Sequence, residues 1–119
     1  MNSKVRGIIN FLEANLHRQI KMVEITALAG LSPSRVDNLF KTEFGKSPGQ
    51  YLKDLRMQKA RLLLETTTMK IKQIRLAVGY QDHSHFFQDF KKQFGLTPSE
   101  YREHYLTVIQ TESETRKKQ

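Results

Sequence analysis

Apolar residues recur along this chain at intervals of three and four positions, which is the spacing of one face of an α-helix. The first stripe lies within residues 4–17 and consists of Val5, Ile8, Ile9, Leu12 and Leu16. The longest lies within residues 48–65 and has Leu52, Leu55, Ala60, Leu63 and Leu64 on its apolar side. Five further helices are expected at about 23–29, 34–44, 71–78, 83–94 and 98–105, and no segment is a strand candidate. The pattern predicts an all-α fold of seven helices.

Capping residues mark where several of these helices begin. Ser32 precedes Pro33, which gives the third helix a hydroxyl N-cap and a proline in its first turn. Asp82 is suited to cap the sixth helix in the same way. Two capping boxes, each with proline at the first helical position, follow as SPGQ at 47–50 and TPSE at 97–100. Each box predicts the start of another helix.

One unit occurs twice in the chain. Residues 30–52 read GLSPSRVDNLFKTEFGKSPGQYL, and residues 79–102 read GYQDHSHFFQDFKKQFGLTPSEYR. A shift of 50 aligns Ser34 with Ser84, Phe40 with Phe90, Lys41 with Lys91, Phe44 with Phe94, Gly45 with Gly95, Pro48 with Pro98 and Tyr51 with Tyr101. A shift of 49 aligns Ile25 with Ile74 and Gly30 with Gly79. Each unit is a short helix, a glycine-containing turn and a longer helix, which is typical of a helix-turn-helix.

The composition narrows the classes of function. The 119 residues include 20 Lys and Arg against 12 Asp and Glu, which gives a formal net charge of +8. Such a charge favours polyanionic partners, nucleic acid first and an acidic membrane surface second. The chain has no Cys, no signal peptide and no apolar run long enough to cross a bilayer. A soluble cytoplasmic protein is therefore expected.

Enzyme and metal chemistry are not predicted. The chain has no glycine-rich phosphate loop, nucleophile elbow or paired carboxylates, so neither an enzyme nor a cofactor is expected. His83 and His85 could suggest a metal site, but residues two apart on a helix do not face each other. His85 and Asp89 are four residues apart and are expected to be able to pair.

Two helix-turn-helix units joined by a long helix, with LRMQKARLLL at 55–64 in that helix, resemble the AraC/XylS family of bacterial transcription regulators. The resemblance covers about residues 5–104, and its most specific part is Gly79, Tyr80, Asp82, Ser84, Phe86, Phe90, Lys91, Lys92, Gly95, Thr97, Pro98, Tyr101 and Arg102. It implies a monomer that binds double-stranded DNA by inserting two recognition helices into successive major grooves. It also implies a role in transcription, usually activation through contact with RNA polymerase.

The resemblance also suggests how the chain is organised. It would be one DNA-binding module with helix-turn-helix subdomains at 3–47 and 67–105, a connector helix at 48–66 and a polar tail at 106–119. Family members usually carry an effector-sensing or dimerisation domain ahead of this module. The chain is either a stand-alone regulator or the C-terminal module of a longer effector-responsive protein, and the second is favoured. The tail is expected to extend the last helix or to form a flexible end.

Outward positions on the two longer helices of the repeat are the candidate DNA contacts. The first recognition helix must turn its phenylalanines inward, which leaves outward Ser34, Arg35, Asp37, Asn38 and Lys41. On the second recognition helix the outward residues are His83, Ser84, Phe87, Gln88 and Lys91. Asn and Gln suit bidentate contacts to adenine, Arg suits guanine or phosphate, and Lys suits phosphate. Tyr51 and Tyr101 are expected to pack rather than to bind.

Several residues depart from the family pattern and affect the expected target sequence rather than the fold. Asn38 and Gln88 stand where the family commonly has Arg, so two amides replace two cations. Arg75 stands where the family favours Ala, and its charge is expected to extend outward or towards DNA. Two interpretations of Phe87 remain open, contact with a thymine methyl group and packing beside its own helix.

A function from another class is also considered. The chain could be a basic helical interaction module whose surface docks an acidic protein and reads no DNA sequence. The duplication argues against this hypothesis, because two matched recognition helices suit two major-groove segments about 34 Å apart, one turn of DNA.

Overall fold

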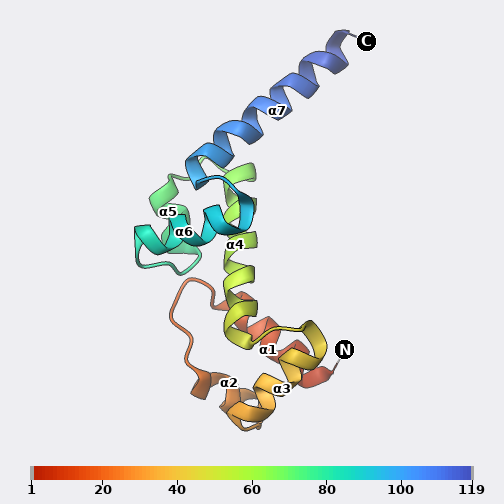
Figure 1. The fold of residues 1–119 in the computed structure, drawn as a ribbon, viewed down its shortest axis with the longest axis vertical. Helices are drawn as coiled ribbons and strands as arrows, with labels where there is room; N and C mark the ends of the chain where they lie inside the picture. The colour runs from red at the N-terminus through yellow and green to blue at the C-terminus, as the bar shows by residue number, and fades with distance from the viewer. Residues whose placement is uncertain (1, 119) are drawn as a thin grey trace. The chain divides into compact units, whose positions relative to one another are not determined.

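The computed structural model describes residues 2–118, with side chains described for residues 2–113. Over that range it consists of seven α-helices and contains no strand. Figure 1 labels the helices. The helices are α1 (Ser3–Ala14), α2 (Met22–Ala29), α3 (Pro33–Phe44), α4 (Pro48–Thr66), α5 (Ile71–Ala77), α6 (His83–Phe94) and α7 (Pro98–Lys118). The predicted all-α class is confirmed.

Two helix ends differ from the prediction. Helix α1 ends at Ala14 instead of about residue 17, because the side-chain amide of Asn15 donates to the carbonyl of Phe11 at 2.8 Å. The backbone N–H of Asn15 turns to the carbonyl of Leu12 at 3.1 Å, which closes the helix. Helix α7 continues to Lys118 instead of ending near residue 105, so the segment called a polar tail extends the last helix as far as it is described.

The chain divides into two compact units, Met1–Arg56 and Met57–Gln119. The division falls inside α4, so the first part of this helix belongs to one unit and the rest to the other. The subdomain boundaries expected from the sequence remain a prediction.

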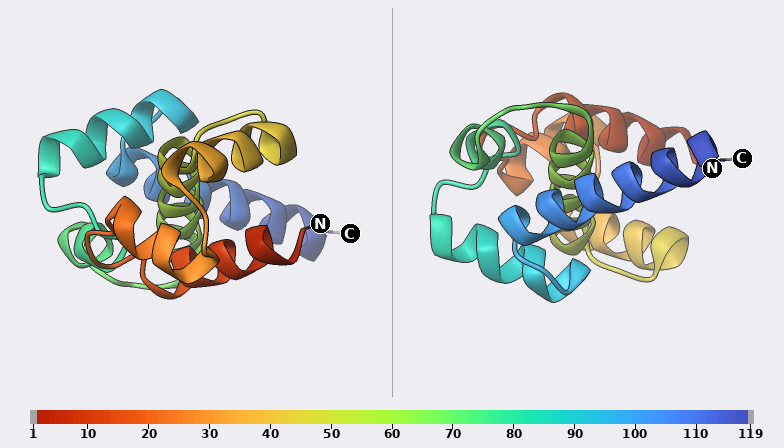
Figure 2. Two further views of the ribbon diagram at one scale, coloured as in Figure 1. Left: turned by 90° about the horizontal axis from the view of Figure 1, so that it is seen from below. Right: turned by 90° about the horizontal axis from the view of Figure 1, so that it is seen from above.

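The core of the first unit is built by α1, α2, α3 and the start of α4. Helix α1 contacts α2, and α2 contacts α3 (Figure 2). The fully packed residues are Ile8, Leu12, Ile25, Val36 and Phe40. The Phe40 ring lies 5.5 Å from the Tyr51 ring, centroid to centroid, in an edge-on arrangement. This contact joins the third helix to the fourth, and the predicted packing role of Tyr51 is confirmed.

The core of the second unit is built by the rest of α4 and by α5, α6 and α7. Its buried residues are Met57, Ala60, Leu64, Ile74, Val78, Phe86 and Phe90. The Phe90 and Tyr101 rings repeat the edge-on contact of the first unit, with centroids 5.6 Å apart. Met57 is completely buried although the apolar stripe read from the sequence did not include it.

The two longer helices of the repeat begin and end alike. The Ser32 hydroxyl accepts from the N–H of Arg35 at 3.3 Å, and the Asp82 carboxylate accepts from the N–H of Ser84 at 2.8 Å. Both helices end at a glycine with positive φ, 71° at Gly45 and 81° at Gly95, a conformation that costs glycine little. The predicted caps at Ser32 and Asp82 are confirmed. The first capping box is only half formed, because the Gln50 N–H donates to the Ser47 hydroxyl while the Gln50 side chain bonds Asp54.

Candidate nucleic-acid interface

The rotation of each recognition helix about its axis is set by two buried side chains one turn apart. These are Val36 and Phe40 in α3, and Phe86 and Phe90 in α6, all completely buried. Because residues four apart lie on the same face of a helix, anchoring them turns the opposite face to solvent. The same physical constraint therefore presents an outer face on both helices.

Eight of the ten predicted DNA contacts lie on these outer faces. The exposed residues are Ser34, Arg35, Asn38 and Lys41 on α3, and His83, Ser84, Gln88 and Lys91 on α6. None of their side chains makes a hydrogen bond or ion pair with another residue that the structure describes. Their donors and acceptors are therefore available to a ligand.

The other two predicted contacts, Asp37 and Phe87, are half-buried. They occupy the same position in the two units. Phe87 packs against the second core, and the His83 ring stacks on it with centroids 4.0 Å apart. Of the two interpretations of Phe87, packing is observed, and contact with a thymine methyl group stays a prediction. His83 in turn has one ring face covered by Phe87.

The expected pairing of His85 with Asp89 is wrong. The Nδ1 atom of His85 lies 2.9 Å from the Asp82 carboxylate, the N-cap of the same helix. The Asp89 carboxylate instead accepts the Tyr80 hydroxyl at 2.6 Å. Asp89 is half-buried and His85 is exposed, whereas Tyr80 packs against the second core and brings its hydroxyl to the carboxylate.

Of the two expectations for Arg75, extension into solvent is not observed, and a position towards DNA stays a prediction. Its side chain is half-buried, and Nη1 donates to the carbonyl of Tyr80 at 2.9 Å. The guanidinium therefore holds the turn between α5 and α6 in place of extending into solvent. In the first unit Thr26 stands at this position and bonds only its own helix, from Oγ1 to the carbonyl of Val23 at 3.1 Å.

Arg102 and Tyr101 fasten the start of α7 to the end of α4. The guanidinium of Arg102 donates to four carbonyls in and just after the last turn of α4, those of Leu63, Leu64, Thr67 and Met69. The Tyr101 hydroxyl donates to the Glu65 carboxylate. Burial, followed by this hydrogen bond, raises the pKa of Tyr101 to about 12. The sequence motif contained both residues, but nothing in their spacing showed these partners.

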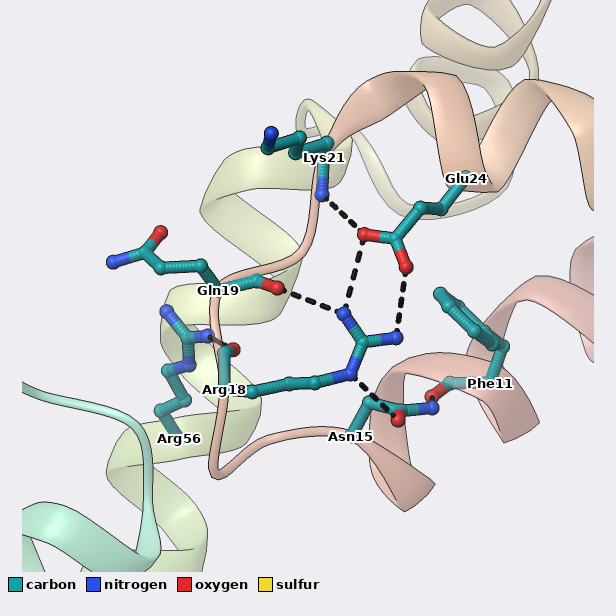
Figure 3. Close-up of polar contacts among 7 residues, drawn as sticks. All are labelled: Phe11, Asn15, Arg18, Gln19, Lys21, Glu24 and Arg56. Carbon is teal, nitrogen blue, oxygen red and sulfur yellow. Dashed lines mark hydrogen bonds and ion pairs between the residues drawn. The ribbon is translucent and has the colours of Figure 1, made fainter.

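A second network, which sequence reasoning missed, holds the loop between α1 and α2 (Figure 3). The Arg18 guanidinium forms a two-pronged pair with the Glu24 carboxylate, at 2.8 and 3.2 Å, and also donates to Asn15 Oδ1 and the Gln19 carbonyl. These bonds from Arg18, with one from the Lys21 N–H, hold the pKa of the Glu24 carboxyl below its ordinary value.

Arg56 of α4 secures the same loop from outside it. Its guanidinium donates to the carbonyl of Leu16 at 3.3 Å and to that of Arg18 at 2.8 Å. The loop carries α2, which contacts the first recognition helix. The two arginines therefore support the first unit, whereas Arg102 supports the second. The large sequence separation of these contacts gave no local signal by which they could be predicted.

Neither a metal-binding cluster nor a membrane-spanning helix occurs in the part of the chain that is described. No three His, Cys, Asp or Glu side chains there are grouped to hold a metal ion. Among residues 2–118 no helix combines the length and apolarity that a bilayer crossing requires.

Comparisons with known proteins agree with the helix-turn-helix fold described above. A family model described as a helix-turn-helix domain matches residues 25–104. The lactose operon transcription activator of Staphylococcus xylosus is 32% identical over 105 residues, which are 88% of this chain and 38% of that protein. The arabinose operon regulatory protein of Salmonella typhimurium is 35% identical over 103 residues, which are 86% of this chain and 37% of that protein. The chain thus spans well under half the length of these relatives.

A solved structure has a similar fold. The chain is similar to a transcriptional regulator from Chromobacterium violaceum described as having an AraC-type DNA-binding domain, with 32% identity and a TM-score of 0.80. The likeness covers 86% of this chain and 91% of that one. The resemblance noted from the closing motif is confirmed, and the chain belongs to the AraC/XylS family of helix-turn-helix domains.

Proposed function

We propose that this chain is the sequence-specific DNA-binding module of a transcription regulator, with α3 and α6 each inserted into a major groove of the target. The observation that carries the proposal is the pair of matched outer faces, whose exposed polar side chains make no hydrogen bond or ion pair with other described residues. A helix presented in this way is what major-groove recognition needs. The family membership supports the same conclusion.

The residues divide by chemistry into two kinds of contact. Lys41 and Lys91 stand at the same position of the two helices and carry charge, so we assign them to phosphate oxygens. Asn38 and Gln88 also match one another and suit the N6 and N7 atoms of adenine, so we assign them to base edges. Phosphate contacts supply affinity, and base contacts supply sequence preference.

The relatives suggest the setting in which the module works. Both relatives described above are far longer than this chain, and one is described as a transcription activator. We propose that the module forms the C-terminal part of a longer effector-responsive activator in the cytoplasm. It would bind DNA as a monomer and contact RNA polymerase from the DNA.

Selection of binding sites from random duplexes tests the proposal. We expect a motif of two short blocks about one helical turn apart, because each recognition helix reads one block. The affinity for that motif should fall steeply with salt. Absence of a motif together with salt-insensitive binding would contradict the proposal and favour the protein-docking alternative.

Lysine substitutions test the assignment of phosphate contacts. Lys41→Ala and Lys91→Ala should weaken binding to the selected motif and to random DNA equally, and each should lower the slope of log K against log [salt] by about 0.9. Lys59→Ala, an exposed lysine outside both recognition helices, serves as the matched control. A loss confined to the selected motif would instead make the lysine a base contact.

A further inference from the structure

A surface pocket of about 490 Å³ lies beside the second recognition helix. Residues of α5, α6 and α7 line it: Ile71, Lys72, Arg75, His83, Phe87 and Ser99. Ile71 and Phe87 supply its apolar lining, and its polar groups are two cations, one imidazole and one hydroxyl. None of the lining residues is acidic, so the pocket has the chemistry of an anion site.

The cations of this pocket are available to a ligand to different degrees. Lys72 is exposed and makes no hydrogen bond or ion pair with any described residue. Arg75 commits Nη1 to the Tyr80 carbonyl and is thereby held in place. His83 begins α6, and its ring rests on Phe87. The nearby acid, Asp82, lies outside the lining and already accepts the Ser84 N–H and pairs with His85.

The first unit has no equivalent of this pocket's charge. The repeat aligns the six lining residues with Met22, Val23, Thr26, Pro33, Asp37 and Gly49. These include no cation and one acid, so an anion is disfavoured there. Because the two units are otherwise built alike, the charge of the second pocket is not a by-product of the fold.

We propose that this pocket binds one backbone phosphate of the DNA that α6 reads, with Lys72 as the principal cation. The inference rests on the proposed function and adds a contact that only the second unit makes. A phosphate suits the site because the Lys72 ammonium is a mobile point charge. Contacts to phosphates beside a helix in the major groove also fix the position of the duplex. The second unit therefore anchors the module more strongly than the first.

Lys72→Gln tests the contact, because an exposed side chain can be changed without disturbing the core. One lost phosphate contact lowers the salt slope by about 0.9, which corresponds to about eightfold weaker binding at 0.1 M salt. Lys59→Gln, an exposed lysine of the same unit outside the pocket, is the control and should leave the slope unchanged.

Duplexes that carry one neutral methylphosphonate at successive positions of the second block locate the phosphate. For one of these duplexes the wild type should lose about eightfold and Lys72→Gln should lose nothing more, since both changes remove the same contact. The inference is overturned if Lys72→Gln keeps the wild-type slope, or if its loss adds to that of every methylphosphonate. Failure of the proposed function looks different, because the wild type itself would then select no motif.

Discussion

Corresponding residues of the two units are buried to nearly the same degree. Residues 33–53 and 83–103 have matching degrees of burial at every position except one, where Ser47 is exposed and Thr97 is half-buried. The units differ instead in what surrounds that shared frame. Arg18 and Arg56 secure a loop in the first unit, whereas Arg102 and Tyr101 secure α7 in the second. The buried positions of the two units are therefore alike, and the polar contacts around them differ.

The charge of the short helices shows the same divergence. Helix α2 carries Glu24 and no cation, and this acid is paired with Arg18. Helix α5 carries Lys72 and Arg75, and Gln73 takes the place of the acid. In both helices this third residue accepts the N–H of the N-cap, Lys21 or Lys70, at 2.9 Å. A carboxylate and an amide accept the same capping hydrogen bond, so this cap does not require a negative charge.

The largest expected effects come from the matched core phenylalanines. Phe40→Ala and Phe90→Ala should each lower the free energy of unfolding by about 3–5 kcal/mol, because both rings are completely buried. Phe90 should cost more, since its ring contacts those of Phe86, Phe94 and Tyr101, whereas Phe40 contacts only two described rings. Urea unfolding measures the cost, and hydrogen exchange identifies the unit affected. Equal effects in both units from one substitution would show that they do not unfold separately.

Helix α4 is shared by the two units, so breaking it tests whether they act together. Lys59→Pro removes the bond to the carbonyl of Leu55 and should cost about 3 kcal/mol or more. We expect DNA affinity to fall towards that of one unit, whereas Lys59→Ala should retain it. The measurement is titration with the selected duplex alongside circular dichroism. Full affinity in a folded proline variant would mean that the second unit reads DNA without the first.

The amides test whether the units read different bases. Asn38→Ala and Gln88→Ala should each reduce discrimination by about 1–3 kcal/mol, in one block only, because a bidentate pair with adenine is lost. Binding to random DNA should hardly change, since no charge is removed. Competition with single-base variants of the selected site is the measurement. Equal losses for all variants would place the amides on phosphates, and DNA shape would then carry more of the specificity.

The matched tyrosines Tyr51 and Tyr101 are expected to contribute differently to folding stability at high pH. The folded pKa of Tyr101 lies near 12, above the ordinary value of about 10, so the unfolded chain loses this proton first. The resulting stability is fully present below pH 10 and is lost as the pH approaches 12. We expect a loss of about 1 kcal/mol after discounting for solvent screening at this partly exposed group. Tyr101→Phe should remove it.

Tyr51→Phe is the matched control for this experiment. Burial, followed by the charge of Glu13, also raises the pKa of Tyr51, but no carboxylate accepts its hydroxyl among the described residues. Its contribution to the high-pH loss should be the smaller one. Unfolding free energies from urea titrations at pH 9.5 to 12 measure both, and an unchanged slope in Tyr101→Phe would contradict the assignment.

The repeat, the helices and the faces that the helices present follow from local sequence patterns. Apolar spacing placed Phe40 and Phe90 inward, and the caps at Ser32 and Asp82 set where the recognition helices begin. These features are local, because a helix face and an N-cap depend on residues within about one turn of each other. The outward positions of Asn38 and Gln88 followed for the same reason.

The polar contacts between residues far apart in the sequence depend on how the helices pack. Arg56 reaches the carbonyl of Arg18, and Arg102 reaches that of Met69, across more than thirty residues in each case. Arg75 donates to the carbonyl of Tyr80 and Phe87 packs against the core, because a backbone carbonyl and an apolar surface were available to them once the helices packed. A side chain's nearest partner depends on elements brought together by burial, and spacing along the chain does not contain that information.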